Sequence, residues 1–184
     1  MIEPADTLRA EHETMQGLLS VLDGMAARLR SDVPVPREDL ADVMTVIVEF
    51  ADRCHHAKEE DVLFPALASA SPQVGAEIAR RLTSDHQAFR KIAASLRESV
   101  PRAGRSRVAR DQLGKLLSTY ARVLREHVEI EEQTLLPEFE RAMEFAARQR
   151  IAEEFERLER EDVGLGMHEA YDAIVRRLGE TYAE

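Results

Sequence analysis

The sequence predicts an all-α protein: an up-down-up-down four-helix bundle with an additional C-terminal helical segment. Ala, Leu, Glu and Arg, all strong helix formers, dominate the 184 residues, which include only 8 Gly and 7 Pro. Apolar residues recur at steps of three and four along long stretches, which short segments containing Pro, Gly or Ser separate. A pattern of histidine and glutamate also occurs twice, which indicates two similar helical hairpins.

The first predicted hairpin joins two helices. The first helix begins near Pro4, because proline is favoured in the first turn. Its core-facing stripe comprises Leu8, His12, Met15, Leu19, Leu22, Ala26 and Leu29. The segment SDVPVPRED (31–39) ends it, and the second helix runs to Pro65, before the break SASPQ (69–73). The stripe of this second helix comprises Leu40, Met44, Ile47, Ala51, His55 and Glu59.

The second predicted hairpin has the same plan. The stripe of its first helix comprises Ile78, Leu82, His86, Phe89, Ala93, Leu96 and Val100. The segment PRAGRS (101–106) closes this helix. The stripe of the last bundle helix comprises Leu113, Leu117, Tyr120, Leu124, His127, Glu131 and Leu135. Short connections make successive helices antiparallel, which predicts the bundle.

A C-terminal helical extension, residues 141–184, is expected to pack on the bundle domain of residues 1–140. An amphipathic pattern continues from Phe139 to Leu158 and breaks at Gly164 and Gly166. A last helix is predicted at 167–182, with His168, Tyr171, Val175, Leu178 and Tyr182 on one side. This extension also offers a surface for pairing, so that a homodimer is an alternative to a monomer.

Charge and composition exclude several classes of partner. The formal net charge is −10, from 35 acidic and 25 basic residues, and such a surface repels nucleic acid phosphates and anionic lipids. The single cysteine, Cys54, allows no intrachain disulfide and fits a reducing compartment. No apolar run approaches the roughly 20 residues of a membrane span, and the N-terminus is unlike a signal peptide. We expect a cytoplasmic protein with no nucleic acid or membrane partner.

The repeated pattern is H-x-x-x-E-E-x-x-L-(F/L)-P, at residues 55–65 and again 72 positions later at 127–137. In each copy the histidine and the first glutamate lie one turn apart on the same face of a helix. The matching pairs are His55 with His127, Glu59 with Glu131, Glu60 with Glu132, and Pro65 with Pro137. The helix before each copy carries one core-facing histidine, His12 or His86. The bundle therefore directs four histidines and two glutamates inward.

These inward-facing groups predict a metal centre. A single histidine on an apolar face is usually a hydrogen-bonded core residue, but a buried, unpaired carboxylate costs several kcal/mol. Two cations would offset the burial of Glu59 and Glu131 together. Imidazole and carboxylate suit iron, manganese or zinc, and one glutamate from each hairpin can bridge two ions about 3.5–4 Å apart. The lack of clustered cysteines argues against an iron–sulfur or Cys-rich zinc site.

The order of these residues resembles the hemerythrin-like family, also called HHE cation-binding domains. The segments HHAKEEDVLFP and HVEIEEQTLLP carry the likeness, which covers about residues 5–140. The resemblance implies a non-haem centre of two Fe ions with an oxo or hydroxo bridge and two carboxylate bridges, for which Zn or Mn can substitute. The implied terminal ligands are His12, His55, His86 and His127, and the implied bridges are Glu59 and Glu131.

The sequence also departs from the oxygen-carrying hemerythrins. Those proteins have a second histidine one turn along the third helix, where this chain has Arg90. Their fourth-helix carboxylate is an aspartate five residues after the histidine, whereas Glu131 follows His127 by four. The loss of one donor argues against simple reversible oxygen carriage. A ferritin-like site is also disfavoured, because the chain lacks E-x-x-H.

Two further histidines have open roles. His168 can be a metal ligand if the extension covers the open end of the bundle, or else an outer hydrogen-bonding partner or a core residue. On an ideal α-helix His56 points about 100° away from His55, which makes it the spare histidine of the pair. A shifted alignment that pairs His56 with Glu60 is the alternative.

The expected function is non-haem di-iron binding with a small diatomic ligand or peroxide as partner. O₂, NO or peroxide would reach the centre in sensing, stress response or iron handling. One alternative is a di-iron enzyme that decomposes peroxide or oxidises a small molecule. Another is a helical interaction module with a structural metal. The sequence assigns no catalytic residue, and a site class of this kind hosts several functions.

Overall fold

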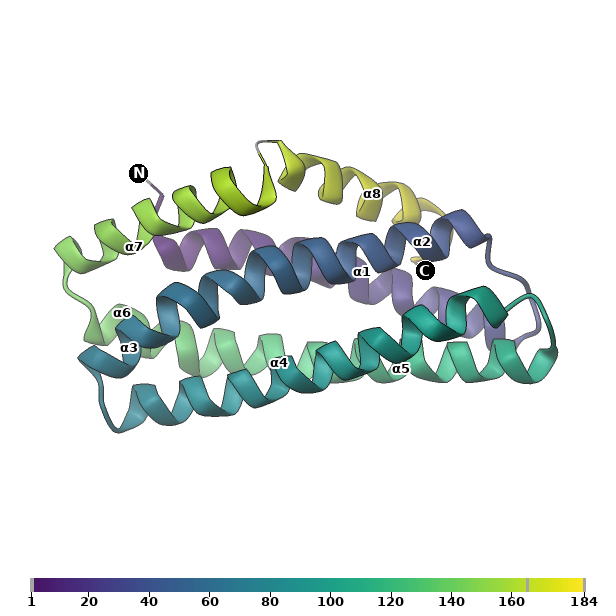
Figure 1. Ribbon diagram of the computed structural model, residues 1–184, viewed down its shortest axis with the longest axis horizontal. Helices are drawn as coiled ribbons and strands as arrows, with labels where there is room; N and C mark the ends of the chain where they lie inside the picture. The colour runs from purple at the N-terminus through teal and green to yellow at the C-terminus, as the bar shows by residue number, and fades with distance from the viewer. Residues whose placement is uncertain (1, 165, 184) are drawn as a thin grey trace.

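The computed structural model describes residues 2–164 and 166–183. This part of the chain contains helices and no β-strand, which confirms the predicted all-α class (Figure 1). In chain order, with π or 3₁₀ turns written η, the segments are α1 (Pro4–Arg30), α2 (Arg37–Thr45), η1 (Val46–His56), η2 (Lys58–Leu63), α3 (Phe64–Ala70), α4 (Val74–Ser99), η3 (Val100–Arg102), α5 (Arg107–Ile130), η4 (Glu131–Leu135), α6 (Leu136–Ala142), α7 (Phe145–Leu158), η5 (Glu159–Val163) and α8 (Met167–Tyr182).

Four long helical rods form the bundle, as the apolar periodicity predicts. They are α1, the rod from α2 to α3, α4, and the rod from α5 to α6, and they lie side by side (Figure 1). Helix α5 packs against both α1 and α4, and α3 packs against α4. Ser106 caps α5, since its side chain accepts a hydrogen bond of 3.1 Å from the Ala109 N–H. None of the helices in the described residues has the length and apolar character needed to cross a membrane.

Two apolar clusters fill the bundle, one towards each end. The larger contains residues such as Leu22, Phe50 and Leu124, and the smaller contains Leu8 and Phe139. Each rod contributes to both clusters, and between them it carries buried histidine or glutamate. The polar centre therefore lies between two apolar layers that exclude water.

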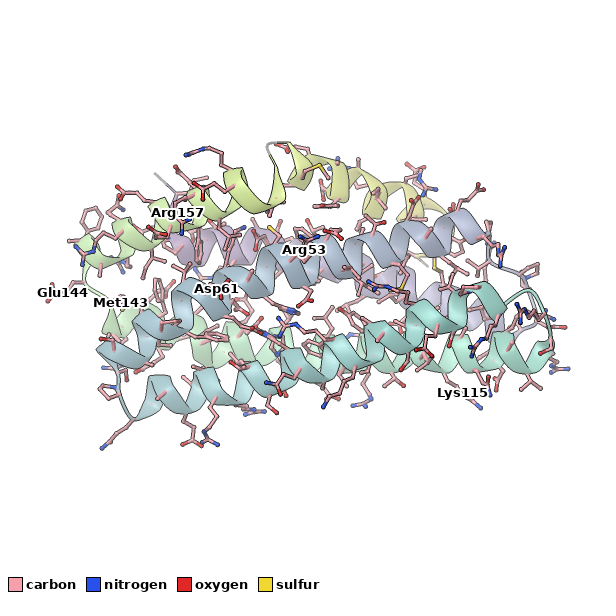
Figure 2. The ribbon with its side chains drawn as sticks, viewed as in Figure 1. Arg53, Asp61, Lys115, Met143, Glu144 and Arg157 are labelled. Atoms are coloured by element: carbon pink, nitrogen blue, oxygen red, sulfur yellow. The ribbon has the colours of Figure 1, made fainter. Side chains whose placement is uncertain are left out.

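The outer surface contrasts with this buried polar layer. Charged side chains such as Arg53, Asp61 and Lys115 are exposed on the outside of the bundle (Figure 2). Ion pairs along one helix, such as Arg53 with Glu49 at 3.0 Å, are common there. Exposed pairs of this kind contribute about 0–1 kcal/mol each, so the burial of apolar side chains supplies most of the stability.

Three π-helical segments occur where the repeated motif lies. The first two, η1 and η2, contain the His55–Glu59 pair, and η4 begins at Glu131. A π turn holds more residues than an α turn, so that neighbouring side chains are separated by less than the 100° of an α-helix. These wider turns change which side chains point into the bundle.

The extension lies along α1 (Figure 1). Helix α7 and η5 lead to a break at Gly164 and Gly166, whose φ angles of 102° and 78° favour glycine, as the sequence predicts. Helix α8 then packs closely on α1, because a Cβ at Gly24 would lie 1.8 Å from the carbonyl oxygen of Tyr182. The Tyr182 hydroxyl also donates to Asp39 Oδ2 at 2.6 Å, which ties the end of α8 to α2.

Candidate metal centre

The six donors that the sequence predicts come together in the middle of the bundle. Their side chains are all buried, with at most 2% of each residue exposed. Each rod brings one histidine to this layer, and the second and fourth rods add one glutamate each. The side chains are His12 from α1, His55 and Glu59 from the second rod, His86 from α4, and His127 and Glu131 from the fourth rod.

The donors form two groups that share Glu131. In each group, one ligand atom from every residue lies within 4.8 Å of the others. The first group is His12, His55 and Glu131, and the second is Glu59, His86, His127 and Glu131.

The two glutamates lie between the groups. Glu131 directs Oε2 to His12 Nε2 at 3.1 Å and Oε1 to His127 Nε2 at 2.6 Å. Glu59 does the same less closely, with Oε1 3.9 Å from His55 Nε2 and Oε2 3.3 Å from His86 Nε2. Each carboxylate therefore offers one oxygen to each group, which is the arrangement that bridges two ions.

Most of these inward-facing atoms have no hydrogen bond within the described residues. They are Nε2 of His12 and His55 and both oxygens of Glu59 and Glu131. Some of these atoms lie near one another, such as Glu131 Oε2 and His12 Nε2, but their geometry is not that of a hydrogen bond. Buried polar atoms without partners cost free energy, and almost all such atoms in proteins find one. Cations placed between them would satisfy both the nitrogen lone pairs and the carboxylate charges.

The outward nitrogens of the four histidines all face carboxylates. His12 Nδ1 lies 2.6 Å from Glu132 Oε1, and His86 Nδ1 lies 2.6 Å from Glu60 Oε1. Since an ionised carboxylate can only accept, each ring donates from Nδ1 and leaves the Nε2 lone pair directed inward. Such carboxylate–histidine pairs orient the imidazole towards a metal and increase its basicity.

The acidic residues that precede His12 and His86 lie beside the other two histidines, but only His55 is hydrogen-bonded, since His127 Nδ1 has no hydrogen bond within the described residues. His55 Nδ1 lies 2.8 Å from Glu11 Oε2, and His127 Nδ1 lies 3.5 Å from Asp85 Oδ2. The orienting carboxylate thus always comes from another rod.

This outer set was missed by the sequence analysis, although a signal for it exists. The second glutamate of each E-E pair, Glu60 or Glu132, contacts the histidine of the opposite hairpin. The acid–histidine dipeptides at 11–12 and 85–86 also recur. To pair these repeated acids with the four histidines, one must know which helices are neighbours, and the sequence does not show this.

Arg90, where oxygen carriers have a histidine, supports this outer set. Its guanidinium lies 2.8 Å from Asp52 Oδ1 and 3.0 Å from Glu60 Oε1. Because Glu60 in turn contacts His86 Nδ1, Arg90 positions the carboxylate that orients a candidate ligand. The donor missing at position 90 is thus replaced by a positive charge on the outside of the centre.

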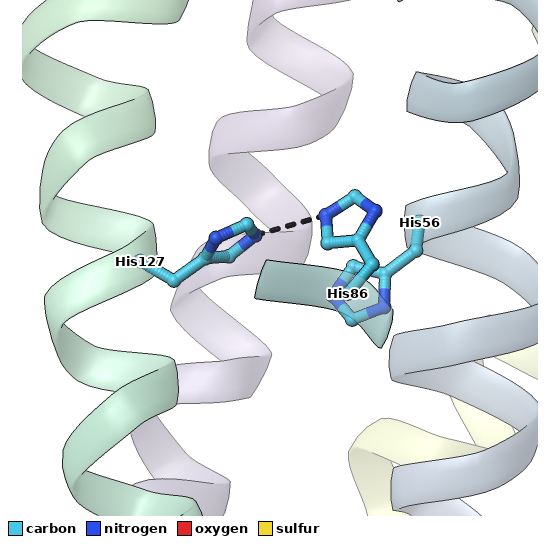
Figure 3. A group of neighbouring side chains, drawn as sticks. All are labelled: His56, His86 and His127. Carbon is cyan, nitrogen blue, oxygen red and sulfur yellow. Dashed lines mark hydrogen bonds between the residues drawn. The ribbon is translucent and has the colours of Figure 1, made fainter. Parts of the chain in front are cut away.

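His56 also faces the centre, although an ideal helix directs it away. Its ring is buried and stacks on His86, with centroids 3.9 Å apart and planes 18° apart. It forms a third close group of donor atoms with His86 and His127 (Figure 3). The π turns explain this outcome, because they reduce the angle between His55 and His56. The expected pairing of His55 with Glu59 is retained.

His168 lies outside the inner set. Its Nε2 is 3.0 Å from Cys54 Sγ and 3.6 Å from Glu11 Oε1. The extension therefore brings His168 to Glu11, which orients His55, rather than to the inward nitrogens. Lys58, fully buried, ion-pairs with the same Glu11 and lies 2.5 Å from Glu159 Oε1. A line of charged groups thus connects His55 to the surface beneath the extension.

The electrostatics of the metal-free centre show why it needs positive charge. Burial, and next the charge of Glu131, raise the pKa of Glu59 well above its usual value. Burial would also raise the pKa of Glu131, but the charge of His127 and the contacts with His12, His127 and His55 together outweigh burial and lower that pKa well below its usual value. Burial likewise lowers the pKa of His86 to about 4, with His127 adding to the effect. Two neighbouring carboxylates are not both easily ionised here without cations.

The donor set fits first-row transition metals. Imidazole nitrogen and carboxylate oxygen are suited to iron, manganese and zinc, and the inner groups contain no sulfur. The unpartnered nitrogens and oxygens satisfy the test that a metal site requires, because they converge and are oriented from outside.

Comparison with protein families supports this interpretation. The model described as "Hemerythrin HHE cation binding domain" matches residues 3–139 and, in a second match, residues 77–181. The first match includes all six predicted donors, and the second includes His86, His127 and the extension. Comparisons with curated proteins and with solved structures gave no match.

Proposed function

This chain belongs to the hemerythrin HHE cation-binding domain family, and from that premise we propose that it is a non-haem di-iron protein that interacts with O₂, NO or peroxide. The metal-binding character follows from the family and from the converging donors. The choice of iron, the number of ions and the small ligand are the proposed parts. Sensing, stress response and iron handling are the roles that such chemistry would serve.

The observation that carries the proposal is the position of Glu59 and Glu131. Each directs one oxygen to a histidine of one group and its second oxygen to a histidine of the other group. A single-ion site would have no need of two such carboxylates. Two ions of charge +2 or more would balance the pair, and both ions would then share their bridges.

The surroundings favour a small ligand. The donors lie between two apolar layers, and all six side chains are buried. Reduced iron, when bound, supplies electrons and open coordination positions to O₂, NO or peroxide. The chain's own contribution is to orient three of the four imidazoles from outside and to exclude bulk water and larger substrates.

The test is metal analysis of protein purified without oxygen. We expect two irons per chain, and an absorption band in the near ultraviolet that grows when air is admitted. Two results would overturn the proposal. Protein made in iron-rich medium would contain zinc instead of iron, or protein loaded with ferrous iron would bind no more than one iron per chain. NO added to the reduced protein should change the same spectrum.

A di-iron enzyme is the second candidate, and one observation favours it. Glu11, which orients His55, also lines a surface pocket of about 440 Å³ together with Glu159 and His168. Repeated turnover needs such a connection, because protons must reach the buried centre. Peroxide added in large excess separates the candidates: many molecules consumed per chain indicate an enzyme, and about one indicates a sensor or binder.

A further inference from the structure

We propose that His56 is a fifth histidine ligand, the third nitrogen donor to the ion held by His86 and His127. This inference rests on the proposed metal centre and deepens it, since neither the motif nor the family match distinguishes His56 from a spare residue. It replaces, from a different helix, the donor that is absent at Arg90.

The first argument is the burial of His56 without partners. The residue is fully buried, and both of its ring nitrogens lack a hydrogen bond within the described residues. The nearest acid, Asp52, has Oδ1 at 3.5 Å from Nδ1, and that oxygen accepts a hydrogen bond of 2.8 Å from Arg90. A histidine that serves only to fill space would leave two buried polar atoms unsatisfied, which is unfavourable.

The second argument is geometric. One nitrogen each from His56, His86 and His127 lies within 4.8 Å of the others, and the rings come from three different rods (Figure 3). Nε2 of His86 and Nε2 of His127 face each other at 3.0 Å. Two imidazoles bound at right angles to one ion at about 2.1 Å would have their nitrogens about 3 Å apart. His56 approaches this group from the second rod, with its ring stacked on that of His86, so it would turn out of the stack to direct a nitrogen to the same ion.

The third argument is that an apolar ring would pack here equally well. Phe89 stacks near His56 with centroids 5.6 Å apart, and Phe64 stacks near His86 at 5.8 Å. The position equivalent to His56 in the second copy of the motif is Val128, an apolar residue in the larger cluster. The repeat therefore tolerates an apolar side chain at this position. Only the first copy of the motif has a ring nitrogen there, and that ring packs beside His86 and His127.

The consequence is an asymmetric centre. The ion at His86 and His127 has three nitrogen donors, whereas the ion at His12 and His55 has two. Because the two carboxylates are shared, the difference in donors makes the ion at His86 and His127 the more tightly held of the two.

The experiment compares His56→Phe with a matched control, Phe89→Leu, which changes a neighbouring ring but removes no donor. Ferrous iron is titrated into metal-free protein under a chelator of known affinity, and iron per chain is measured. We expect His56→Phe to weaken one of the two ions at least tenfold and Phe89→Leu to leave both within about threefold. Unchanged affinities in His56→Phe would overturn the role of His56, while wild-type protein that binds two irons would leave the proposed function intact.

Unfolding of the metal-free proteins provides a second readout. His56→Phe should be as stable as wild type or more stable, because it removes two unsatisfied nitrogens, yet metal should stabilise it less. The opposite result would show that His56 contributes only to packing: the metal-free variant would be less stable than wild type, and metal would stabilise both proteins equally. If the variant does not fold, the ring nitrogens of His56 can be followed by ¹⁵N NMR in wild-type protein on addition of zinc. A signal that does not shift would overturn the proposal.

Discussion

The two halves of the candidate metal centre have the same kinds of inner side chains and different surroundings. Each half has two histidines. A carboxylate from another rod hydrogen-bonds Nδ1 of His12, His55 and His86, whereas His127 Nδ1 has only Asp85 nearby and no hydrogen bond within the described residues. In the first half, Glu11 is 3% exposed and lies 2.8 Å from His55. In the second, the side chain of Asp85 is 38% exposed and lies 3.5 Å from His127. A duplicated motif can thus preserve the ligands while their environments diverge.

The difference has two physical sources. The extension covers the first half, where His168 lies beside Glu11 and the buried Lys58 pairs with both Glu11 and Glu159. The second half lacks this cover within the described residues, and His56 packs beside its histidines instead. The residues equivalent to Lys58 and His56 in the second copy are Ile130 and Val128, both apolar. Positions next to the ligands therefore distinguish the halves.

The largest expected effect is loss of metal from both halves. Glu131→Gln should reduce bound iron below one per chain, because one side chain reaches His12 and His127 and carries the charge that both ions need. Glu129→Gln, at an exposed position on the same helix, is the control and should keep two irons. Elemental analysis after loading gives the result. A full complement of iron in Glu131→Gln would show that Glu131 is no bridge.

The next largest effect concerns the buried charge of the first half alone. Lys58→Met leaves Glu11 buried without its ammonium partner, which should lower the free energy of unfolding by about 3–5 kcal/mol. Ile130→Met, the equivalent position in the second half, should cost less than about 1.5 kcal/mol. Urea unfolding of metal-free protein measures both. Equal losses would mean that the two halves do not differ in buried charge.

Acid should also act unequally on the halves. Burial would raise the pKa of Glu11, but its hydrogen bond with His55 and the charge of Lys58 outweigh burial and lower it to about 2. A lowered carboxylate pKa stabilises the fold above the unfolded value of about 4.5, and this contribution is lost as pH falls towards 2.

Urea midpoints of metal-free protein between pH 5 and pH 2 would test this. Between pH 5 and pH 2 the free energy of unfolding should decrease less in Glu11→Gln than in wild type, by an amount on the order of 3 kcal/mol. Asp85→Asn should change it less, since Asp85 is partly exposed and its lowered pKa arises mainly from His127. Identical slopes in the two variants would contradict the comparison.

The smallest effects are expected from the outer glutamates. Glu132→Gln should weaken the ion at His12, and Glu60→Gln the ion at His86, each by about 10–100-fold, because the amide no longer fixes the imidazole. Chelator competition under anaerobic conditions measures each ion. Weakening of the opposite ion in either variant would show that the orienting contacts are not specific to one half.

The sequence by itself determined the helices and which six candidate donors face the interior. Apolar residues at steps of three and four define which face of each rod is buried, and His12, His55, Glu59, His86, His127 and Glu131 lie on those faces. The break at Gly164 and Gly166 was predicted from glycine as a helix breaker, and both residues have a positive φ in the structure. These features depend on local periodicity and backbone preference, which a sequence displays directly.

The tertiary structure alone decided which residues surround those donors. Glu60 orients His86, Glu132 orients His12, and His168 reaches Glu11, and all these pairs depend on which helices are neighbours. His56 points inward because the second rod contains π turns, which reduce the angle between successive side chains. The apolar periodicity of the sequence is too coarse to predict this small rotation. The buried face of a helix depends on the periodicity of its own residues, whereas the contacts of a side chain depend on how different helices pack. For this reason the sequence alone determined the first and the tertiary structure decided the second.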